Sequence, residues 1–263
     1  MERDKTDLSI IVVSFNTKYF LEKCLGSISR QRVNGDLEVI VVDNGSQDNS
    51  CEMIKNKFSK VKLIENKENF GFGKANNQGA KIARGDYLFF LNPDTLIKDN
   101  IFPKIIEVFK NDPQVGIVSP LLVLENGEIQ PWAYGQEENL PQLIKRKIKK
   151  DLNKTIDWVS GAAFVTRADI FRKIGGFDEN FFAYFEDRDL CLRIRKIGYK
   201  IVVLPEIKVI HFGGKSLISD KKRKKLYYQS QNYFWRKHYG FLESILMRFF
   251  RLPYVIKSKL REE

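Results

Sequence analysis

The chain has 263 residues, 43% of them hydrophobic, which is enough for one large α/β domain with a terminal extension. Its 45 Lys and Arg against 33 Asp and Glu leave a net charge of +12, which favours polyanionic partners: nucleotides, nucleic acids or acidic membrane surfaces. The charged start lacks the apolar core of a signal peptide, no segment is apolar enough to span a bilayer, and the three cysteines lack metal-ligand spacing, so we expect a cytoplasmic protein with reduced thiols.

The first half of the chain alternates short apolar runs with helical patterns. The apolar runs predict strands at 8–15, 37–42, 61–64 and 87–91, and the helical patterns begin at 17 and cover 51–58 and 73–84. This alternation predicts an α/β fold with an open, doubly wound, mostly parallel sheet. The right-handed crossover rule then puts the carboxyl end of every strand on one sheet edge, where such folds bind ligands.

The second half is organised differently. Its apolar runs predict strands at 115–124, 156–166 and 200–211, with a hairpin turn at 125–128. From Ser219 on, the pattern is basic and aromatic and predicts a helical extension over 219–263. We therefore divide the chain into an α/β domain, 1–218, whose two halves are 1–95 and 96–218, and this extension.

An unbroken apolar run, 87–91, stops abruptly at Asn92-Pro93-Asp94. A short run that is apolar at both its odd and its even positions is typical of a strand buried on both faces, as in a parallel sheet. Pro93 donates nothing to a sheet ladder and favours an extended Asn92. We therefore expect Asp94 to leave a central strand at the ligand-binding edge, where its carboxylate could hold a metal ion against a diphosphate.

Polar residues also close the first two strands. Asp43-Asn44-Gly45-Ser46 follows the second strand, and Ser14-Phe15-Asn16 follows the first. A carboxylate at Asp43 could accept a hydrogen bond from a ribose hydroxyl or a base N–H. The structural alternative is an Asx-turn that only ends the strand.

Two glycines precede the helix predicted at 73–84, within Asn69–Asn77. They allow close backbone approach and an anion at the helix N-terminus, to which Lys74 would add positive charge. The stretch differs from a dinucleotide fingerprint because Asn76 replaces its third glycine and because it follows the third strand. A loop whose glycines serve only the turn is the alternative.

Carboxylates and a histidine supply further candidates. Glu186 and Asp187 follow an aromatic run and flank the inward stripe of the next helix, whereas Asp189 lies on another face and can pair with Arg193. Helix capping is the structural alternative, but aromatic surroundings raise a carboxylate pKa, which suits a general base, and we favour Asp187 ahead of Glu186. His211 closes a strand before Gly213-Gly214 and could complete a divalent-metal site with Asp94.

Eight motifs occur together in a fixed order. They are Val-Ser-Phe-Asn, Val-Val-Asp-Asn-Gly-Ser, Asn-Phe-Gly-Phe-Gly-Lys-Ala-Asn-Asn, Leu-Asn-Pro-Asp, Trp-Val-Ser-Gly-Ala, Gly-Gly-Phe-Asp-Glu, Glu-Asp-Arg-Asp-Leu and His-Phe-Gly-Gly-Lys-Ser. From about residue 8 to 240 the chain resembles the family 2 glycosyltransferases with the A-type fold (GT-A). Within that family it is most similar to the rhamnosyltransferase-like branch that builds bacterial surface polysaccharides.

The resemblance implies roles for particular residues. Those expected to contact a nucleotide-diphospho-sugar are Ser14, Phe15, Asn16, Asp43, Asn44, Gly71, Phe72, Lys74, Asn76, Asn77 and Asn92. Asn92-Pro93-Asp94 stands where the family has its Asp-X-Asp motif, so Asp94, with His211 nearby, would hold Mg or Mn. Asp187 matches the catalytic base, with Glu186 beside it, and 158–162 would line the acceptor side.

The implied activity is that of an inverting, metal-dependent glycosyltransferase of the hexosyltransferase class. It would move a sugar, with rhamnose as the candidate, from a nucleotide diphosphate donor to a hydroxyl of a glycan or polyprenyl-linked acceptor in cell-surface polysaccharide synthesis. Residues 1–95 would be the nucleotide-binding half and 96–218 the acceptor half of the catalytic domain.

Three alternatives stay open at this point. A sugar nucleotidyltransferase has a similar sheet but normally carries a Gly-rich, basic loop where this chain has Ser14–Thr17. A basic nucleic-acid-binding protein fits the charge, although no nucleic-acid motif is present and we expect no nucleic-acid partner. The apolar and basic residues at 242–259 predict either a helix that rests on the inner face of the cell membrane or one that packs on the domain or on a second subunit, as in a homodimer.

Overall fold

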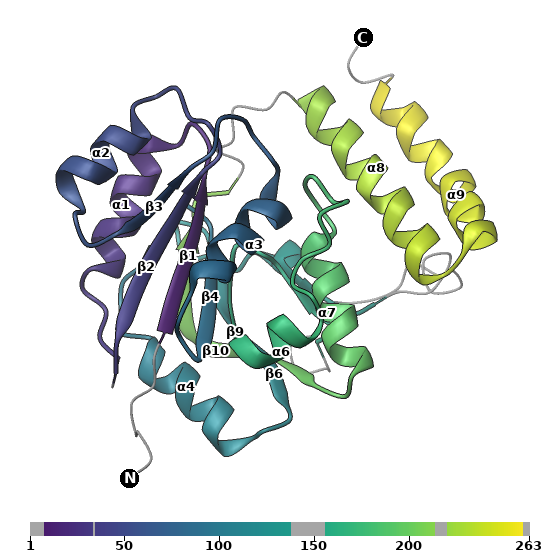
Figure 1. Cartoon of the computed structure of the whole chain (residues 1–263). Helices are drawn as coiled ribbons and strands as arrows, with labels where there is room; N and C mark the ends of the chain where they lie inside the picture. Colours follow the sequence, from purple (N-terminus) through teal and green to yellow (C-terminus); the bar gives the residue numbers. More distant parts are fainter. Residues whose placement is uncertain (1–7, 34, 138–155, 214–219, 260–263) are drawn as a thin grey trace.

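The computed structural model describes residues 8–33, 35–137, 156–213 and 220–259 (Figure 1). Within them the main sheet has eight strands: β1 (Leu8–Ser14), β2 (Leu37–Asp43), β3 (Lys62–Glu65), β4 (Tyr87–Leu91), β5 (Thr95–Ile97), β6 (Val115–Val123), β9 (Ala163–Arg167) and β10 (Lys200–His211). A small second sheet pairs β7 (Tyr134–Gly135) with β8 (Trp158–Val159). The helices are α1 (Lys18–Ile28), α2 (Ser50–Lys57), α3 (Phe72–Ile82), α4 (Phe102–Asn111), α6 (Ala168–Lys173), α7 (Glu186–Lys196), α8 (Asp220–His238) and α9 (Phe241–Lys259).

The main sheet has the strand order β3-β2-β1-β4-β9-β6-β10-β5. The pairs from β3 to β4 are parallel, as the alternation of strands and helices predicts. β9 runs antiparallel to both β4 and β6, and β5 runs antiparallel to β10. The prediction that all carboxyl ends share one edge is therefore wrong for these two strands, because the crossover rule applies only to parallel connections.

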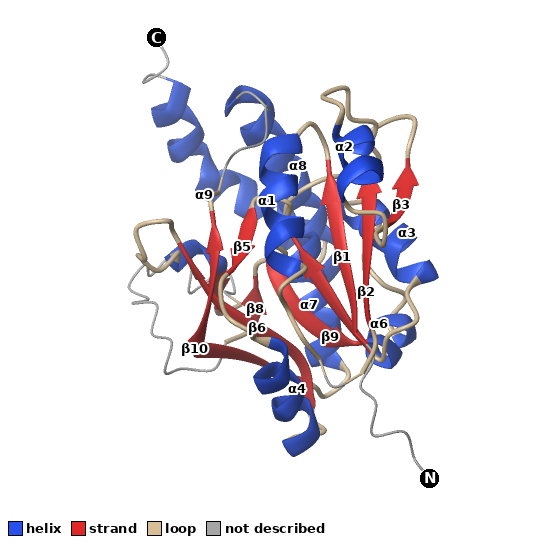
Figure 2. Cartoon of the chain, turned by 90° about the vertical axis from the view of Figure 1, so that its left-hand side faces the viewer, coloured by secondary structure: helices blue, strands red, loops and turns tan. Residues whose placement is uncertain are grey.

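The predicted central strand, β4, is buried on both faces. Its successive side chains point to opposite sides of the sheet. Phe89 packs edge-on against Phe102 of α4, whereas Phe90 contacts Phe171 of α6 and Phe177 on the other side. Helices cover both faces accordingly, with α1, α2 and α4 on one side and α3, α6 and α7 on the other (Figures 1 and 2).

The apolar run at 156–166 forms two strands instead of one. The chain turns at Ser160–Ala162, where Ser160 N–H donates to Ala133 O at 2.8 Å and Gly161 N–H donates to a side chain of α7. These backbone donors leave the ladder to serve neighbouring elements, so the strand is interrupted. The hairpin at 125–128 is confirmed, with Gly127 at a φ of 86° and Leu124 N–H donating to Glu128 O.

The C-terminal extension forms an antiparallel helix pair, α8 and α9, at one end of the molecule (Figure 1). A second, smaller core joins it to the loop before α7: Phe181 and Phe185 pack with Phe234 and Trp235 of α8 and Met247 of α9. The aromatic run that precedes the carboxylates is thus explained by its packing on the extension.

An ionic cluster reinforces this contact. Asp189 of α7 is wholly buried and accepts from Arg193 at 2.7 Å, Lys237 at 2.6 Å and His238 at 2.7 Å. Burial alone would raise the pKa of Asp189, but the hydrogen bond from His238 and the charges of Arg193 and Lys237 outweigh it and lower that pKa. The ionised form therefore stabilises the fold above the ordinary aspartate pKa, and this contribution is lost as pH falls below it.

We expect Asp189→Asn to lower the free energy of unfolding by about 3–5 kcal/mol, because it removes the charge of a wholly buried carboxylate that pairs with the partly buried Arg193 and Lys237. Asp169→Asn is the matched control, since Asp169 pairs with Arg167 while its side chain is 64% exposed, and it should cost less than about 1 kcal/mol. Urea unfolding of both variants measures the difference. Equal losses would show that the buried cluster does not brace α7 against α8.

Candidate active site

The ends of β1 and β2 lie side by side, with Ser14 in register with Asp43. Asp43 is buried; its Oδ1 accepts from Ser46 N–H at 2.7 Å, while its Oδ2 is buried without a partner among the described residues. The predicted Asx-type turn is therefore present, but it uses only one carboxylate oxygen. A buried acceptor without a donor is unfavourable unless a ligand supplies the donor.

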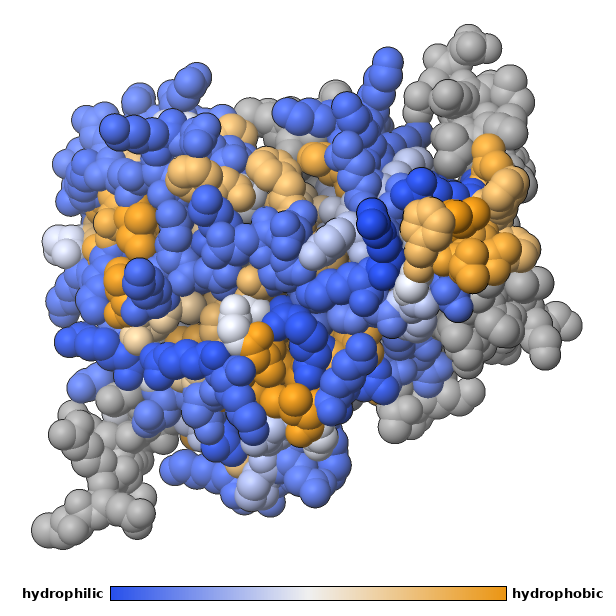
Figure 3. All heavy atoms as spheres, turned by 45° about the vertical axis from the view of Figure 1, so that its right-hand side comes forward, coloured by the Kyte–Doolittle hydropathy of each residue, from blue (hydrophilic) through white to orange (hydrophobic). Residues whose placement is uncertain are grey.

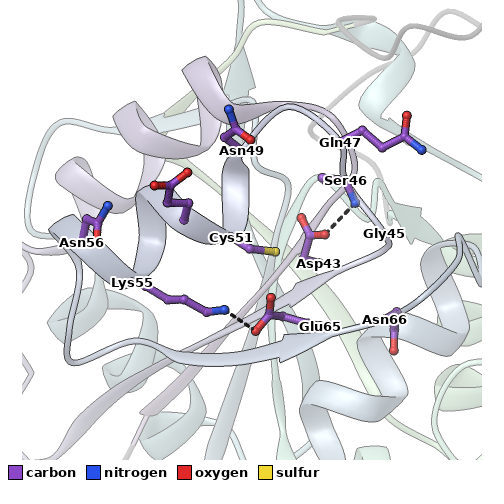
Figure 4. A pocket seen from close by; sticks show the side chains of 11 residues that line it. Asp43, Gly45, Ser46, Gln47, Asn49, Cys51, Lys55, Asn56, Glu65 and Asn66 are labelled. Atoms are coloured by element: carbon purple, nitrogen blue, oxygen red, sulfur yellow. Dashed lines mark hydrogen bonds and ion pairs between the residues drawn. The ribbon is translucent and has the colours of Figure 1, made fainter.

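A pocket of about 430 Å³ opens beside Asp43 (Figure 4). Its lining comes from β2, the following loop, α2 and the end of β3: Asp43, Gly45, Ser46, Gln47, Asn49, Cys51, Glu52, Lys55, Asn56, Glu65 and Asn66. The Asp43, Cys51 and Glu65 side chains point into the same space, and Lys55 pairs with Glu65 at 2.8 Å. Burial, together with the Asp43 and Glu65 carboxylates, raises the pKa of Cys51 to about 12, so its thiol stays neutral.

Asn16 locks the loop after β1 to the loop after β2. It has a φ of 53°, a left-handed conformation that asparagine tolerates. Its N–H donates to Ser46 Oγ at 2.8 Å, and its Oδ1 accepts from Gln47 N–H at 2.7 Å. Phe15, which precedes it, keeps 37% of its surface exposed next to these loops. The polar residues predicted at the two strand ends are thus brought together.

The glycine-bearing loop before α3 is attached to the same edge. Asn44 is buried and donates to Gly71 O at 3.1 Å and to Asn69 Oδ1 at 3.2 Å. Gly71 has a φ of 85°, and a Cβ there would lie 2.4 Å from Phe182 O, so only glycine fits. The Asn44 side chain therefore positions the loop. A contact between Asn44 and a nucleotide sugar remains a prediction.

The other residues predicted on this loop and helix also have protein partners. Asn76 donates to Phe72 O at 3.0 Å, and Asn77 donates to Phe177 O at 2.9 Å. The Lys74 Nζ lies 4.4 Å from the centre of the Phe70 ring. These contacts orient α3 within the protein. The contacts that we predict between its side chains and a nucleotide sugar remain predictions.

The predicted metal residues are adjacent. Asp94 Oδ1 lies 3.4 Å from His211 Nε2, and Phe212 N–H donates to Asp94 O at 2.9 Å. The register explains this proximity, because His211 at the end of β10 pairs with Thr95 of β5, directly after Asp94. Two candidate ligands that lie 117 positions apart in the sequence are therefore brought together by an antiparallel strand pair.

Gln130 fixes the orientation of His211, and sequence reasoning missed it. It is wholly buried; its Nε2 donates to His211 O at 2.6 Å, and its Oε1 lies 2.9 Å from His211 Nδ1. The amide oxygen can only accept, so Nδ1 carries a proton and Nε2 is the ring nitrogen that faces Asp94. This arrangement is typical of metal-binding histidines. No sequence signal marks a glutamine in a loop for this role.

The two carboxylates at the start of α7 differ. Asp187 is partly exposed; its Oδ2 accepts from Gly161 N–H at 2.9 Å and its Oδ1 from Arg188 N–H at 2.8 Å. Glu186 is buried, and its Oε2 has no partner among the described residues. Burial, with the neighbouring Asp187 charge, raises the pKa of Glu186 well above its usual range. The raised pKa favours the protonated, neutral form of Glu186, while Asp187 is oriented and reachable.

The turn Ser160–Ala162 connects the candidate base to the candidate metal residues. Ala162 O accepts from Asn92 N–H at 2.9 Å, and the adjacent Gly161 donates to Asp187. Phe72 lies over the same turn, 3.1 Å from where a Cβ of Gly161 would stand. Asn92, two residues before Asp94, and Asp187 are therefore both hydrogen-bonded to one short segment, at the edge where β4 ends and β9 begins.

The sequence comparison decides the family. Residues 9–175 match the model of the family described as Glycosyl transferase family 2. The chain belongs to glycosyl transferase family 2. As a member of this family it is a glycosyltransferase, which sets aside the nucleotidyltransferase and nucleic-acid-binding alternatives.

Two curated relatives carry rhamnosyltransferase names. The N-acetylglucosaminyl-diphospho-decaprenol L-rhamnosyltransferase of Mycobacterium tuberculosis is 25% identical over 236 residues, covering 78% of this chain and 75% of the relative. Rhamnosyltransferase WbbL of Escherichia coli strain K12 is 26% identical over 223 residues, covering 77% and 82% respectively.

Solved structures confirm the GT-A fold. The mannosyltransferase PcManGT of Pyrobaculum calidifontis, in complex with GDP-Man and Mn²⁺, matches with a TM-score of 0.66 at 19% identity, covering 92% of this chain and 67% of that one. S. aureus TarS 1–349 matches with a TM-score of 0.61, also at 19% identity, covering 86% and 64%. In the part of the chain that the structure describes, no helix is both long enough and apolar enough to cross a membrane.

The donor set of this glycosyltransferase fits a divalent ion that is shared with a substrate. Among the described residues, no cluster of three or more His, Cys, Asp or Glu could hold a metal alone. Asp94 and His211 offer one carboxylate and one imidazole nitrogen, and diphosphate oxygens would complete such a shell.

We expect Gln130→Leu to weaken Mn²⁺ binding by about 10- to 100-fold, because it frees the His211 ring and its tautomer. Asp94→Asn should weaken binding at least as much. Mn²⁺ titration by electron paramagnetic resonance, with a nucleoside diphosphate present, gives the affinities, and exposed Gln114→Leu serves as the control for glutamine loss. Unchanged Mn²⁺ affinity in both Gln130→Leu and Asp94→Asn would place the metal elsewhere.

Proposed function

We propose that this enzyme transfers a hexose of the L-rhamnose class, with inversion, from a nucleoside diphosphate donor to a hydroxyl of a glycan or polyprenyl-linked acceptor during cell-surface polysaccharide synthesis. The rhamnosyltransferase names of two relatives support the sugar, and the decaprenol-linked substrate in one of those names supports the acceptor class. The observation that carries the proposal is the Asp187 carboxylate, fixed by Gly161 beside the Asn92–Asp94 turn.

The Asp43 pocket is the proposed subsite for the nucleoside. Asp43 Oδ2 is a buried acceptor without a donor in the described part of the chain, and a pyrimidine N3–H or a ribose hydroxyl would supply that donor. Phe15, exposed at the end of β1, offers an aromatic surface close to it. The diphosphate would then extend from this subsite along the sheet edge toward Asp94.

In the proposed reaction the acceptor oxygen attacks the anomeric carbon as the bond from that carbon to the diphosphate breaks. The acceptor proton passes to Asp187, and the electron pair of the broken bond leaves with the diphosphate. A divalent ion held by Asp94 and His211 would offset the negative charge on the leaving group. Gly161 and Arg188 donate to separate oxygens of Asp187 and so hold the carboxylate in one orientation.

The environment of Asp187 suits a base. Burial raises its pKa above the ordinary aspartate value, while the hydrogen bonds from Gly161 and Arg188 and the Arg188 charge lower it only part of the way back. A raised pKa makes the carboxylate a stronger proton acceptor, provided that it is ionised at the working pH.

We expect Asp187→Asn to lower kcat by about 100- to 10,000-fold while the donor affinity measured by calorimetry stays close to wild type. Glu186→Gln should cost much less, because burial favours the neutral form of Glu186, which glutamine imitates. Exposed Asp99→Asn controls for the loss of an aspartate. If Asp187→Asn turns over normally, or if Glu186→Gln is the more damaging change, the assignment of the base is wrong.

The pH profile tests the same residue independently. Because Asp187 must be ionised and its pKa is raised, kcat/KM should rise with pH through a value above the ordinary aspartate pKa of about 3.9. Steady-state rates across the acid range, with circular dichroism to confirm that the fold persists, provide the measurement. An acid limb at or below that value would contradict Asp187 as the base.

The donor base is tested by a thermal-shift screen of uridine, deoxythymidine and guanosine diphosphates, each with and without Mn²⁺. We expect stabilisation by a pyrimidine diphosphate that increases with Mn²⁺ and disappears in Asp94→Asn, since a ligand that binds only the folded state stabilises it. Stabilisation by guanosine diphosphate alone would contradict the proposed pyrimidine contact at Asp43.

A further inference from the structure

The helix α9 presents its apolar side to solvent. Three residues on one side of α9 face α8: Ser244 donates to Asn232 O at 3.3 Å, Met247 packs into the small core, and Arg251 donates to Gln231 Oε1 at 2.9 Å. At 100° per residue, Leu242, Leu246 and Phe249 lie on the opposite side of the helix, and Phe241, Phe250 and Leu252 flank them. A helix that only completed a soluble fold would bury this side.

The exposure of these six residues, here called the α9 apolar face, is large. The exposed fractions are 64% for Phe241, 70% for Leu242, 45% for Leu246, 65% for Phe249, 45% for Phe250 and 47% for Leu252. Figure 3 shows hydrophobic side chains gathered at the end of the molecule that carries α8 and α9. Contiguous exposed apolar surface of this kind marks an interaction site, unlike single exposed hydrophobic residues.

The charge around the α9 apolar face identifies its partner. Residues 220–259 contain eleven Lys or Arg and two Asp or Glu, so they hold +9 of the chain's net +12. The run Lys221–Lys225 begins α8, and the antiparallel pairing places it beside the C-terminal half of α9, where Arg251 contacts Tyr228 and Gln231. Apolar residues on one face of a helix with a dense basic margin are typical of helices that lie in an anionic lipid interface.

A second copy of the chain fits this surface less well. A two-fold contact would place the same patch on both subunits, so the Lys221–Lys225 run and Arg248 would each face a surface of the same positive sign. An anionic bilayer supplies the opposite charge as well as apolar depth for Phe and Leu side chains.

We propose that α8 and α9 form a membrane-docking surface, with the α9 apolar face inserted among the headgroups of anionic phospholipids and the basic residues on the lipid phosphates. This inference goes beyond the proposed glycosyl transfer and does not depend on it. The surface is joined to the candidate active site through α7, which contacts α8 by way of Asp189.

The test is flotation of the full-length protein with vesicles of phosphatidylcholine alone or of phosphatidylcholine mixed with phosphatidylglycerol. Wild type should float with the anionic vesicles and much less with the neutral ones. A triple variant, Leu242→Gln, Leu246→Gln and Phe249→Gln, should lower the partition coefficient at least about tenfold. Each substitution removes the favourable free energy of transferring an apolar side chain from water into the lipid. These positions are exposed, so the fold should be retained, as circular dichroism would verify.

Two further variants sharpen the result. Ile82→Gln, Ile129→Gln and Ile197→Gln together form the matched control, because these isoleucines are 40–45% exposed elsewhere on the molecule and should leave flotation unchanged. Lys221→Gln, Lys225→Gln and Arg248→Gln together should reduce binding to anionic vesicles roughly tenfold or more, with little effect on neutral vesicles.

Three results would overturn the proposal. They are failure of wild type to float with anionic vesicles, equal flotation of wild type and the α9 triple variant, and a dimer in solution that the triple variant dissociates without any vesicle binding. Transfer to a water-soluble acceptor by the triple variant provides a separate readout, so loss of docking is distinguishable from failure of the proposed chemistry.

Discussion

The antiparallel strand β9, inserted between β4 and β6, is the constraint on which the candidate site depends. Because β9 runs against β4, its amino end meets the carboxyl end of β4, with Ala163 in register with Leu91. The turn just before β9 therefore lies against Asn92, whose N–H donates to Ala162 O. The N–H of Gly161, in the same turn, donates to Asp187. A parallel strand in the same position would have placed this turn at the opposite edge of the sheet.

The C-terminal helix α8 supports the loop that leads to the candidate base. The loop that leads into α7 contains two aromatic residues with positive φ, Tyr184 at 68° and Phe185 at 69°, a conformation that costs free energy and needs support from its surroundings. Support comes from α8: Phe185 packs on Phe234, and Ser230 donates to Ala183 O at 2.6 Å. The extension thus supports the loop that positions the proposed base, Asp187. Its outer surface is the proposed membrane contact, so lipid docking would bring the acceptor side of the enzyme to the membrane.

The acidic residues of the site owe their different states to their partners. Among the described residues, Asp43 has one carboxylate oxygen without a donor, and Glu186 is buried without a partner for Oε2. Asp187 is oriented by two backbone donors. Asp189, three positions after Glu186, is surrounded by cations and serves the fold instead. Sequence places Glu186, Asp187 and Asp189 in one short acidic segment, and only the packing around each carboxylate separates binding, proton transfer and structural support.

The sequence alone determined the order of strands and helices from β1 to β4, the buried central strand ending at Asn92-Pro93-Asp94, the family, and the pairing of Asp189 with Arg193, because these depend on local periodicity, turn residues and short motifs. Tertiary structure decided the antiparallel directions of β5 and β9, the break at Ser160–Ala162, and the role of Gln130 beside His211. These features arise from contacts between segments far apart in the chain, and no local pattern encodes which distant backbone donor or side chain will arrive. For the same reason the sequence predicted an apolar, basic C-terminal helix, whereas only its packing on α8 decided that the apolar side faces outward.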